Sequence, residues 1–347
     1  MNGLLDRRRA MQMALLIPAI CGDLTSRAMA GEPLADVDPD LRPMAQLILD
    51  YPSKWTPSIP PAEQRRFNAT VAHPKPAADV PISQIMVPGL KGQPSVRALM
   101  FGASTAQRLR PAIIYVHGGG YIFGSPEESA AYVQDLVRRH DCLVISPDYR
   151  LAPEMPFPGA REDVYAVLAY LNRDAARLGI DPSRIVIFGG SAGGGLAAQV
   201  ALAARDRHEF ALAGQALLYP MLDDRTGSTR TPAATVGRIG FNAEANRASW
   251  TYYLGRPAGS ERIPEGAVPS RISNLSGLPP TFVGVGNLDL FLEEDVEFAQ
   301  RLIVTGVATE LITVPGAYHA FDGLVPTAPI SRRFNASVQD FIARRLA

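Results

Sequence analysis

Short runs of apolar, often β-branched residues recur along the chain from residue 112 onward. They are Ala112–Val116, Leu143–Ser146, Ile185–Phe188, Gln215–Leu218, Thr281–Val285 and Leu311–Val314. Stretches with helical spacing lie between or after these runs, for example over 164–171 and 296–302. Strands that alternate with helices predict βαβ units and a parallel sheet that is buried on both faces. The pattern therefore predicts an α/β fold.

Two segments depart from this alternation. In the first, residues 31–84, apolar residues have helical spacing between Leu41 and Asp50, and a proline-rich stretch follows, which predicts a loosely organised N-terminal segment. The second, residues 223–269, has little strand character and one helix-like stretch, Ala243–Leu254. We expect the core to comprise residues 85–222 and 270–347, with the insertion 223–269 over the carboxyl edge of the sheet.

Composition and charge exclude several kinds of partner. The 34 basic and 34 acidic residues cancel, and no block of like charges occurs, so neither nucleic acid nor an anionic membrane is an implied partner. The two cysteines, Cys21 and Cys142, have no partners at metal-ligand spacing, which excludes a thiolate metal site. Cys142 lies in an apolar run and is interpreted as a core residue.

The first thirty residues resemble a targeting segment. Arg7, Arg8 and Arg9 precede an apolar stretch from Ala10 to Ile20, and Ala28-Met29-Ala30 resembles a cleavage site. This order predicts a twin-arginine signal over residues 1–30 and export to the periplasm or beyond; otherwise we expect a cytoplasmic protein. The apolar stretch falls far short of the ~20 residues that span a bilayer, so no stable membrane anchor is expected. An amphipathic helix that packs on the domain is the alternative.

The motif Gly189-Gly190-Ser191-Ala192-Gly193 indicates a nucleophile elbow. It follows the expected strand at 185–188 and precedes an alanine-rich helical stretch, which is the strand–turn–helix context that such an elbow requires. Glycines at 189 and 193 allow the strand and the helix to approach closely around a strained serine. Ser191 is therefore the candidate nucleophile, although the motif alone could also be a glycine-rich turn without chemistry.

A second glycine motif supports this interpretation. His117-Gly118-Gly119-Gly120 follows the expected strand at 112–116, and its backbone amides can converge on one oxygen. Together with the amide of Ala192 they would form an oxyanion hole. A phosphate-binding loop is the alternative, but the sequence lacks the G-x-x-x-x-G-K-[ST] pattern and a dinucleotide fingerprint. We interpret His117 as a structural residue that orients the loop.

The base and the acid of such a site should follow later strands, in the order Ser, Asp, His. Asp289 follows the expected strand at 281–285, and His319 follows the one at 311–314. Glu293, Glu294 and Asp295 compete with Asp289 for the acid role, but they begin a helix, where carboxylates favour the helix dipole. The remaining histidines, His73, His140 and His208, are interpreted as solvated surface residues.

These motifs resemble the hormone-sensitive-lipase family of bacterial esterases. The resemblance covers roughly residues 85–345 and is carried by His117–Gly120, Asp148–Glu154 with Pro156–Pro158, Ser191–Gly194 and Tyr318–Phe321. It implies an α/β-hydrolase fold with an eight-stranded core sheet, a helical cap made from residues 31–84 and 223–269, and no cofactor. It also implies oxyanion amides at Gly119, Gly120 and Ala192, with Gly118 as the turn residue. Gly190 departs from the family, which usually has Asp, sometimes Thr, at this position.

The expected function is that of a metal-free serine carboxylesterase with Ser191 as nucleophile, His319 as general base and Asp289 as orienting acid. We expect small ester substrates with about two to eight acyl carbons, because pockets of this kind hold a few hundred Å³. Aromatic residues of the two cap segments, Trp55, Trp250, Tyr252 and Tyr253, are expected to roof the site. An amidase or lactonase with the same triad, and a non-catalytic ligand-binding protein, are the alternatives. A homodimer is a possible assembly.

Overall fold

The computed structural model describes residues 34–50, 60–68, 74–103 and 108–347. Its centre is an eight-stranded sheet in the order β1-β2-β4-β3-β5-β6-β7-β8. The strands are β1 (Ile82–Val87), β2 (Val96–Phe101), β3 (Arg110–Val116), β4 (Leu143–Pro147), β5 (Ile180–Gly190), β6 (Gly214–Leu218), β7 (Thr281–Gly286) and β8 (Thr309–Val314). Neighbours pair in parallel from β4 to β8, whereas β2 pairs antiparallel with both β1 and β4. The expected α/β fold with a mostly parallel eight-stranded sheet is confirmed.

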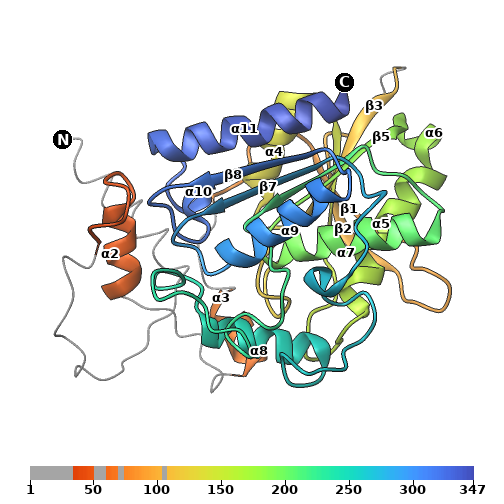
Figure 1. Ribbon diagram of the computed structural model, residues 1–347. Helices are drawn as coiled ribbons and strands as arrows, with labels where there is room; N and C mark the ends of the chain where they lie inside the picture. The colour runs from red at the N-terminus through yellow and green to blue at the C-terminus, as the bar shows by residue number, and fades with distance from the viewer. Residues whose placement is uncertain (1–33, 51–59, 69–73, 104–107) are drawn as a thin grey trace, which may run out of the picture.

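Helices cover both faces of the sheet (Figure 1). The helices α5 (Gly159–Arg173), α7 (Ala192–Arg207) and α9 (Leu292–Val304) pack on one face, and α4 (Ala130–His140) and α11 (Pro329–Leu346) pack on the other. The shorter helices are α6 (Ala175–Leu178), α10 (Phe321–Leu324) and the 3-10 helix η1 (Pro269–Arg271). Two helices, α2 (Arg42–Asp50) and α3 (Pro61–Asn68), precede the sheet, and α8 (Ala243–Leu254) belongs to the insertion.

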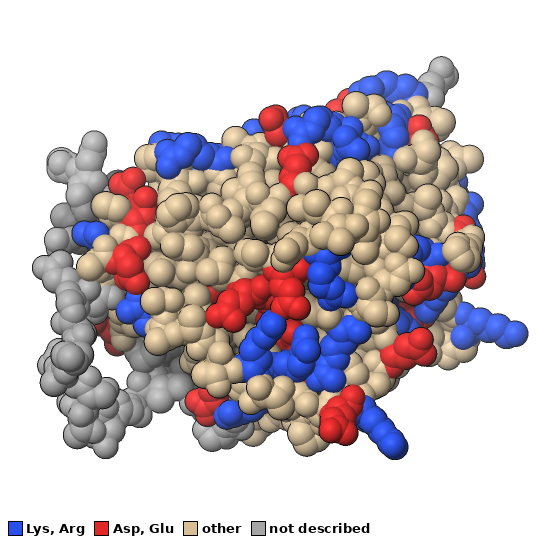
Figure 2. Space-filling model, in the orientation of Figure 1, with Lys and Arg blue, Asp and Glu red and all other residues tan. Residues whose placement is uncertain are grey.

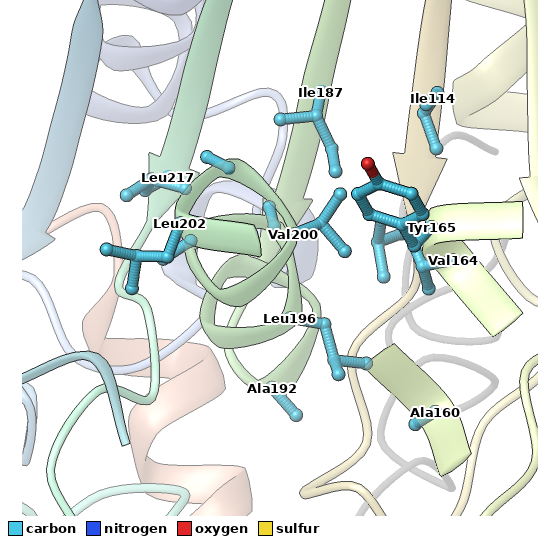
Figure 3. Close-up of a cluster of buried hydrophobic side chains, with 14 of the residues drawn as sticks. Ile114, Ala160, Val164, Tyr165, Ile187, Ala192, Leu196, Val200, Leu202 and Leu217 are labelled. Carbon is cyan, nitrogen blue, oxygen red and sulfur yellow. The ribbon is translucent and has the colours of Figure 1, made fainter. Parts of the chain in front are cut away.

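The core consists of two apolar clusters, one on each face of the sheet. Successive strand residues point to opposite faces, so Ile114 of β3 joins one cluster and Ile113 joins the other. Figure 3 shows the first cluster, in which strand residues such as Ile187 face Leu196 and Val200 of α7. Burial on both faces explains why the parallel strands are continuous apolar runs in the sequence.

Two strands were not predicted from the apolar runs. β1 and β2 precede the first expected strand, and the expected core boundary at residue 85 lies inside β1. β1 is at the edge of the sheet and most of its residues are partly or fully exposed, with Met86 58% exposed. A solvated edge strand does not need a continuous apolar run, so it is hard to recognise in the sequence. Cys142 is fully buried beside β4, as expected.

The described part of residues 31–84 lies against the core. Leu41, Ala45 and Ile48 are buried, and the amide of Asp38 donates to the carbonyl of Gly316 at 3.0 Å. The segment is therefore held close to the loop that carries His319. Residues 1–30, where a signal is expected, and Trp55 lie outside the described residues. None of the described helices is long and apolar enough to cross a bilayer.

Candidate active site

Ser191 lies at the sharp turn between β5 and α7. Its backbone angles are φ 57° and ψ −126°, a conformation that side-chain-bearing residues rarely adopt. The flanking glycines permit this turn: a Cβ atom on Gly189 would lie 2.4 Å from the carbonyl oxygen of Gly193, and one on Gly193 would lie 2.1 Å from that of Val116. Because these distances exclude any side chain at 189 or 193, the motif is explained by close packing around a strained serine.

His319 and Asp289 meet Ser191 at this turn, from loops that follow β8 and β7. Nε2 of His319 lies 3.0 Å from Oγ of Ser191, and its Nδ1 lies 2.8 Å from Oδ2 of Asp289. Oδ1 of Asp289 accepts a hydrogen bond from the amide of Phe291 at 3.0 Å. Asp289 is fully buried, whereas the side chain of His319 is 10% exposed. Residues far apart in the sequence thus form one continuous hydrogen-bonded line.

Aromatic rings that sequence reasoning did not single out surround His319. The ring centroids of Tyr219, Phe241 and Phe291 lie 4.8, 5.8 and 5.3 Å from that of His319. Tyr219 directly follows β6, so the rule that located Asp289 and His319 after strands would also have found it. Phe241 belongs to the insertion, where no strand marks its position. These rings restrict how the imidazole can turn.

The glycine loop after β3 lies beside Ser191. Gly119 and Gly120 have positive φ values of 121° and 56°, and a Cβ on Gly119 would lie 2.1 Å from the carbonyl oxygen of Phe123. Gly118, Gly119 and Gly120 line the same pocket as Ser191. Ala192 is buried at the first turn of α7, where backbone N–H groups point out of the helix and favour negative charge. The residues expected to form the oxyanion hole are therefore close together.

His117, at the start of this loop, contacts the loop through its ring. Its ring stacks on Tyr149 with centroids 4.1 Å apart, and its Nδ1 lies 2.8 Å from the carbonyl oxygen of Gly118. Burial lowers the pKa of His117 to about 4, so the ring is neutral at neutral pH and Nδ1 carries the proton that this contact needs. The hydroxyl of Tyr149 donates to the carbonyl of His117 at 2.9 Å. These contacts fit a residue that orients the loop.

The pocket in front of Ser191 has a volume of about 350 Å³. It is lined by the glycine loop, by His319, by aromatic residues such as Tyr115, Phe123, Tyr219 and Phe241, and by Asn242 and Ala245 at the start of α8. The expected roof is corrected here: Trp250 and Tyr253 are fully buried and pack against Tyr121, and the partly buried Tyr252 does not line the pocket either. The insertion contributes Phe241 to the pocket, whereas its larger aromatic residues are not part of the pocket lining.

The carboxylates that competed with Asp289 are placed differently from what their position at a helix start predicts. Glu293 is exposed, as expected, but Glu294 and Asp295 are buried. Glu294 accepts hydrogen bonds from the amides of Leu222 and Asp223, and it contacts the hydroxyl of Thr226. Glu294 therefore joins α9 to the start of the insertion, and none of the three carboxylates contacts His319 in place of Asp289.

Two of the other histidines can be assigned. His208 is exposed, as expected, whereas His140 is half-buried and its Nε2 lies 2.7 Å from Oε1 of Gln339, which corrects its interpretation as a solvated residue. His73 lies outside the described residues.

Among the described residues, no cluster of three or more His, Cys, Asp or Glu side chains could hold a metal ion. Figure 2 shows acidic and basic side chains next to each other on one face, in keeping with the balanced charge.

Comparison with known proteins shows which family this chain belongs to. Residues 113–323 match the family model described as alpha/beta hydrolase fold. Carboxylesterase NlhH of Mycobacterium tuberculosis is 28% identical over 294 residues, which cover 84% of this chain and 92% of the relative. An esterase of Gibberella moniliformis is 33% identical over 253 residues, which cover 71% of this chain and 78% of the relative.

A solved structure supports the same assignment. The bacterial heroin esterase is 34% identical and has a TM-score of 0.79, and the match covers 90% of this chain and 99% of the solved chain. The family model spans the parallel strands from β3 to β8 and the insertion. The chain belongs to the α/β-hydrolase fold family and, within it, to the hormone-sensitive-lipase group of carboxylic-ester hydrolases.

Proposed function

We propose that the chain is a serine carboxylesterase in which Ser191, His319 and Asp289 act as nucleophile, general base and orienting acid. The observation that carries this proposal is the continuous line of contacts from Oγ of Ser191 through His319 to Asp289, at 3.0 and 2.8 Å. Both distances are within hydrogen-bond reach, which is the geometric condition for proton transfer.

The mechanism follows from this geometry. Nε2 of His319 takes the hydroxyl proton of Ser191 while Oγ attacks the ester carbonyl carbon. The N–H groups of Gly119, Gly120 and Ala192 donate to the oxyanion, and each donor contributes roughly 3–4 kcal/mol to transition-state stabilisation. His319 then gives the proton to the leaving alcohol, and a water molecule that His319 deprotonates hydrolyses the acyl-enzyme. Asp289 accepts from Nδ1–H and stabilises the imidazolium.

The substrates in this proposal are short- to medium-chain esters. The pocket volume of about 350 Å³ and the ring of Phe241 at its wall leave room for a small acyl group. We therefore expect a preference for about two to eight acyl carbons. Measuring kcat/KM for p-nitrophenyl esters of increasing acyl length checks this, and a maximum at long acyl chains would contradict it. An amide analogue in the same series separates an esterase from an amidase.

The central experiment is the Ser191→Ala variant. Loss of the hydroxyl should lower kcat by at least about 10³-fold without changing the fold, because the side chain is small and acts in the chemistry. Ser273→Ala removes the hydroxyl of an exposed serine and is the matched control. Circular dichroism confirms that both variants fold. Turnover by Ser191→Ala at the wild-type rate would overturn the proposal.

We also propose that residues 1–30 are a twin-arginine export signal. Arg7, Arg8 and Arg9 before the apolar stretch support it, as does the small-residue sequence Ala28-Met29-Ala30. Intact mass measurement of exported protein should give a chain that begins at Gly31. Substitution of the three arginines by lysine should abolish export, and unchanged export would contradict the proposal.

A homodimer is the proposed assembly. β8 is the last strand of the sheet, and Ile303 and Val304, at the end of the adjacent α9, are 54% and 79% exposed. A second copy could cover this edge and these apolar side chains. Light scattering after size exclusion should give twice the monomer mass, and Val304→Glu should reduce it to the monomer mass. A wild-type protein that elutes as a monomer would contradict the proposal.

A further inference from the structure

Because residue 190 is glycine, no side chain precedes the nucleophile Ser191. The ring of Tyr219 borders the position that such a side chain would take. A Cβ on Gly190 would lie 3.2 Å from Cε2 of Tyr219 and 3.5 Å from its hydroxyl oxygen. Both residues line the pocket together with Ser191. The phenol ring of Tyr219 therefore lies in tight contact with the position where a side chain at residue 190 would begin.

Tyr219 is fixed in this place by contacts at both ends. Its φ is 36°, which lies in the left-handed region that a tyrosine adopts only when its surroundings impose it. Its amide donates to the carbonyl of Gly284 at 2.6 Å, and its hydroxyl donates to Oδ1 of Asp322 at 2.9 Å. The planes of its ring and of the His319 ring are inclined at 67° in an edge contact. The side chain of Tyr219 is thus held between Asp322 and the imidazole of His319.

Asp322 is a buried carboxylate that the proposed mechanism does not use. It lies in α10, on the turn directly after His319, and is 5% exposed. The pKa of Asp322 is raised, chiefly by burial, although the hydrogen bond from Tyr219, the amides of Asp322 and Gly323 and the nearby His319 partly offset this rise. Tyr115 and Tyr132 are the other titratable groups that face Asp322. A carboxylate would not be buried here without a strong donor, and the Tyr219 hydroxyl is that donor.

We propose that Tyr219 and Asp322 are a positioning pair that holds His319 in line with Ser191, in place of a side chain at residue 190. This inference rests on the proposed role of His319 as general base. Neither residue takes part in proton transfer; Asp322 anchors the phenol, and the phenol fixes the face of the imidazole. A displacement of about 1 Å at a catalytic group can lower the rate on the order of 10²-fold. A contact that holds the imidazole in place should therefore affect kcat.

Variants of Asp322 separate positioning from packing. Asp322→Ala removes the acceptor and should lower kcat by about 10- to 100-fold while KM changes little. Asp322→Asn keeps an oxygen that can accept from Tyr219 and should recover most of the lost kcat. Tyr219→Phe removes the donor, and its loss should not add to that of Asp322→Ala in the double variant. Equal losses in Asp322→Ala and Asp322→Asn, or losses that appear in KM alone, would overturn the proposal.

Gly190→Ala tests the contact of Tyr219 from the other side and by itself removes neither partner of the Tyr219–Asp322 hydrogen bond. Gly190→Ala places a methyl group against the ring of Tyr219 and should lower kcat, and it should cost less in a Tyr219→Ala background, where the ring is absent. Gly323→Ala, beside Asp322, is the matched control, because nothing lies within 4 Å of its added Cβ. If the Asp322 variants do not fold, the double-mutant cycle of Gly190→Ala and Tyr219→Ala tests the proposal by itself. Additive effects of these two substitutions on kcat contradict the proposal.

Active-site labelling keeps this proposal apart from the proposed function. A fluorophosphonate should label Ser191 in the wild-type enzyme, and failure of that labelling contradicts the triad itself. If Ser191 is labelled in the wild type and at the same rate in Tyr219→Phe and Asp322→Ala, the triad stands and the positioning pair is refuted. Slower labelling in these two variants, with a wild-type rate in Gly323→Ala, is the expected result.

Discussion

Replacing Asp295 by asparagine should stabilise the protein at neutral and alkaline pH. Asp295 lies in the first turn of α9, is fully buried, and neither of its carboxyl oxygens has a hydrogen-bond partner among the described residues. Burial, followed by the nearby carboxyl groups of Glu294 and Asp289, raises the pKa of Asp295 well above its ordinary value. Burial therefore favours the protonated form of Asp295 in the folded protein, whereas the same side chain ionises above a pH of about 3.9 in the unfolded chain.

The sign and size of the effect follow from this difference. Because the folded-state pKa is raised, the contribution to stability is complete below the unfolded pKa of about 3.9 and is lost as the pH rises toward the folded-state pKa. The free energy of unfolding falls by about 1.4 kcal/mol for each pH unit in this window. With about 2.1 cal/mol/K of unfolding entropy per residue, a chain of 347 residues loses about 2 °C in Tm per pH unit. Asparagine does not titrate and avoids this loss.

Thermal unfolding at several pH values between 4 and 8 measures the effect. The Tm of Asp295→Asn should exceed that of the wild type by an amount that grows with pH and vanishes near pH 4, where both side chains are neutral. Glu293→Gln, on the exposed neighbour, is the matched control and should follow the wild type. A Tm difference that does not change with pH, or a less stable asparagine variant at pH 8, would refute the reasoning.

Further predictions concern catalysis and the N-terminal segment. Asp289→Asn should lower kcat by about 10⁴-fold because the amide disturbs the tautomer of His319, whereas Glu293→Gln should be nearly silent; kcat measurements that rank them in reverse would move the acid to α9. EDTA should leave kcat/KM unchanged; loss of activity that a divalent ion restores would contradict the metal-free mechanism. Arg65 donates to the carbonyls of Ile122 and Ala152 at 2.6 Å, so Arg65→Met should destabilise the protein by about 1.5–3 kcal/mol in denaturant unfolding, and an unchanged midpoint would contradict this.

The sequence predicts the buried half of the sheet better than its edge. β3 to β7 each contain an apolar run because both faces of these strands are covered, so their hydrophobicity is nearly continuous, whereas β8, at the other edge, is only partly buried. β1 alternates polar and apolar residues less clearly, as Ser83 and Gln84 are adjacent and its apolar Met86 is exposed. Its place in the sheet depends on pairing with β2, which local hydrophobicity does not specify.

The candidate site is predictable for a related reason. Ser191, Asp289 and His319 each follow a parallel strand with an apolar run, and the carboxyl ends of parallel strands meet at one edge of the sheet. Phe241 and Asp322 have no such marker, because the insertion places Phe241 and a short helix places Asp322. Their contacts with the site depend on how those segments fold back over the sheet.

The carboxylates of α9 show that the position of a residue in the sequence does not determine its burial or its hydrogen-bond partners. Glu293, Glu294 and Asp295 share the same helix start, yet Glu293 is exposed and Glu294 is buried with backbone donors. Asp295 is buried, and its carboxyl oxygens have no hydrogen-bond partner within the described part of the chain. Burial raises the pKa of both inner residues well above the ordinary value, so both favour the neutral form. A second anion beside Asp289 would compete for the proton of His319. Burial disfavours the charged form of Glu294 and Asp295, and Asp289 is the carboxylate whose Oδ2 lies 2.8 Å from Nδ1 of His319.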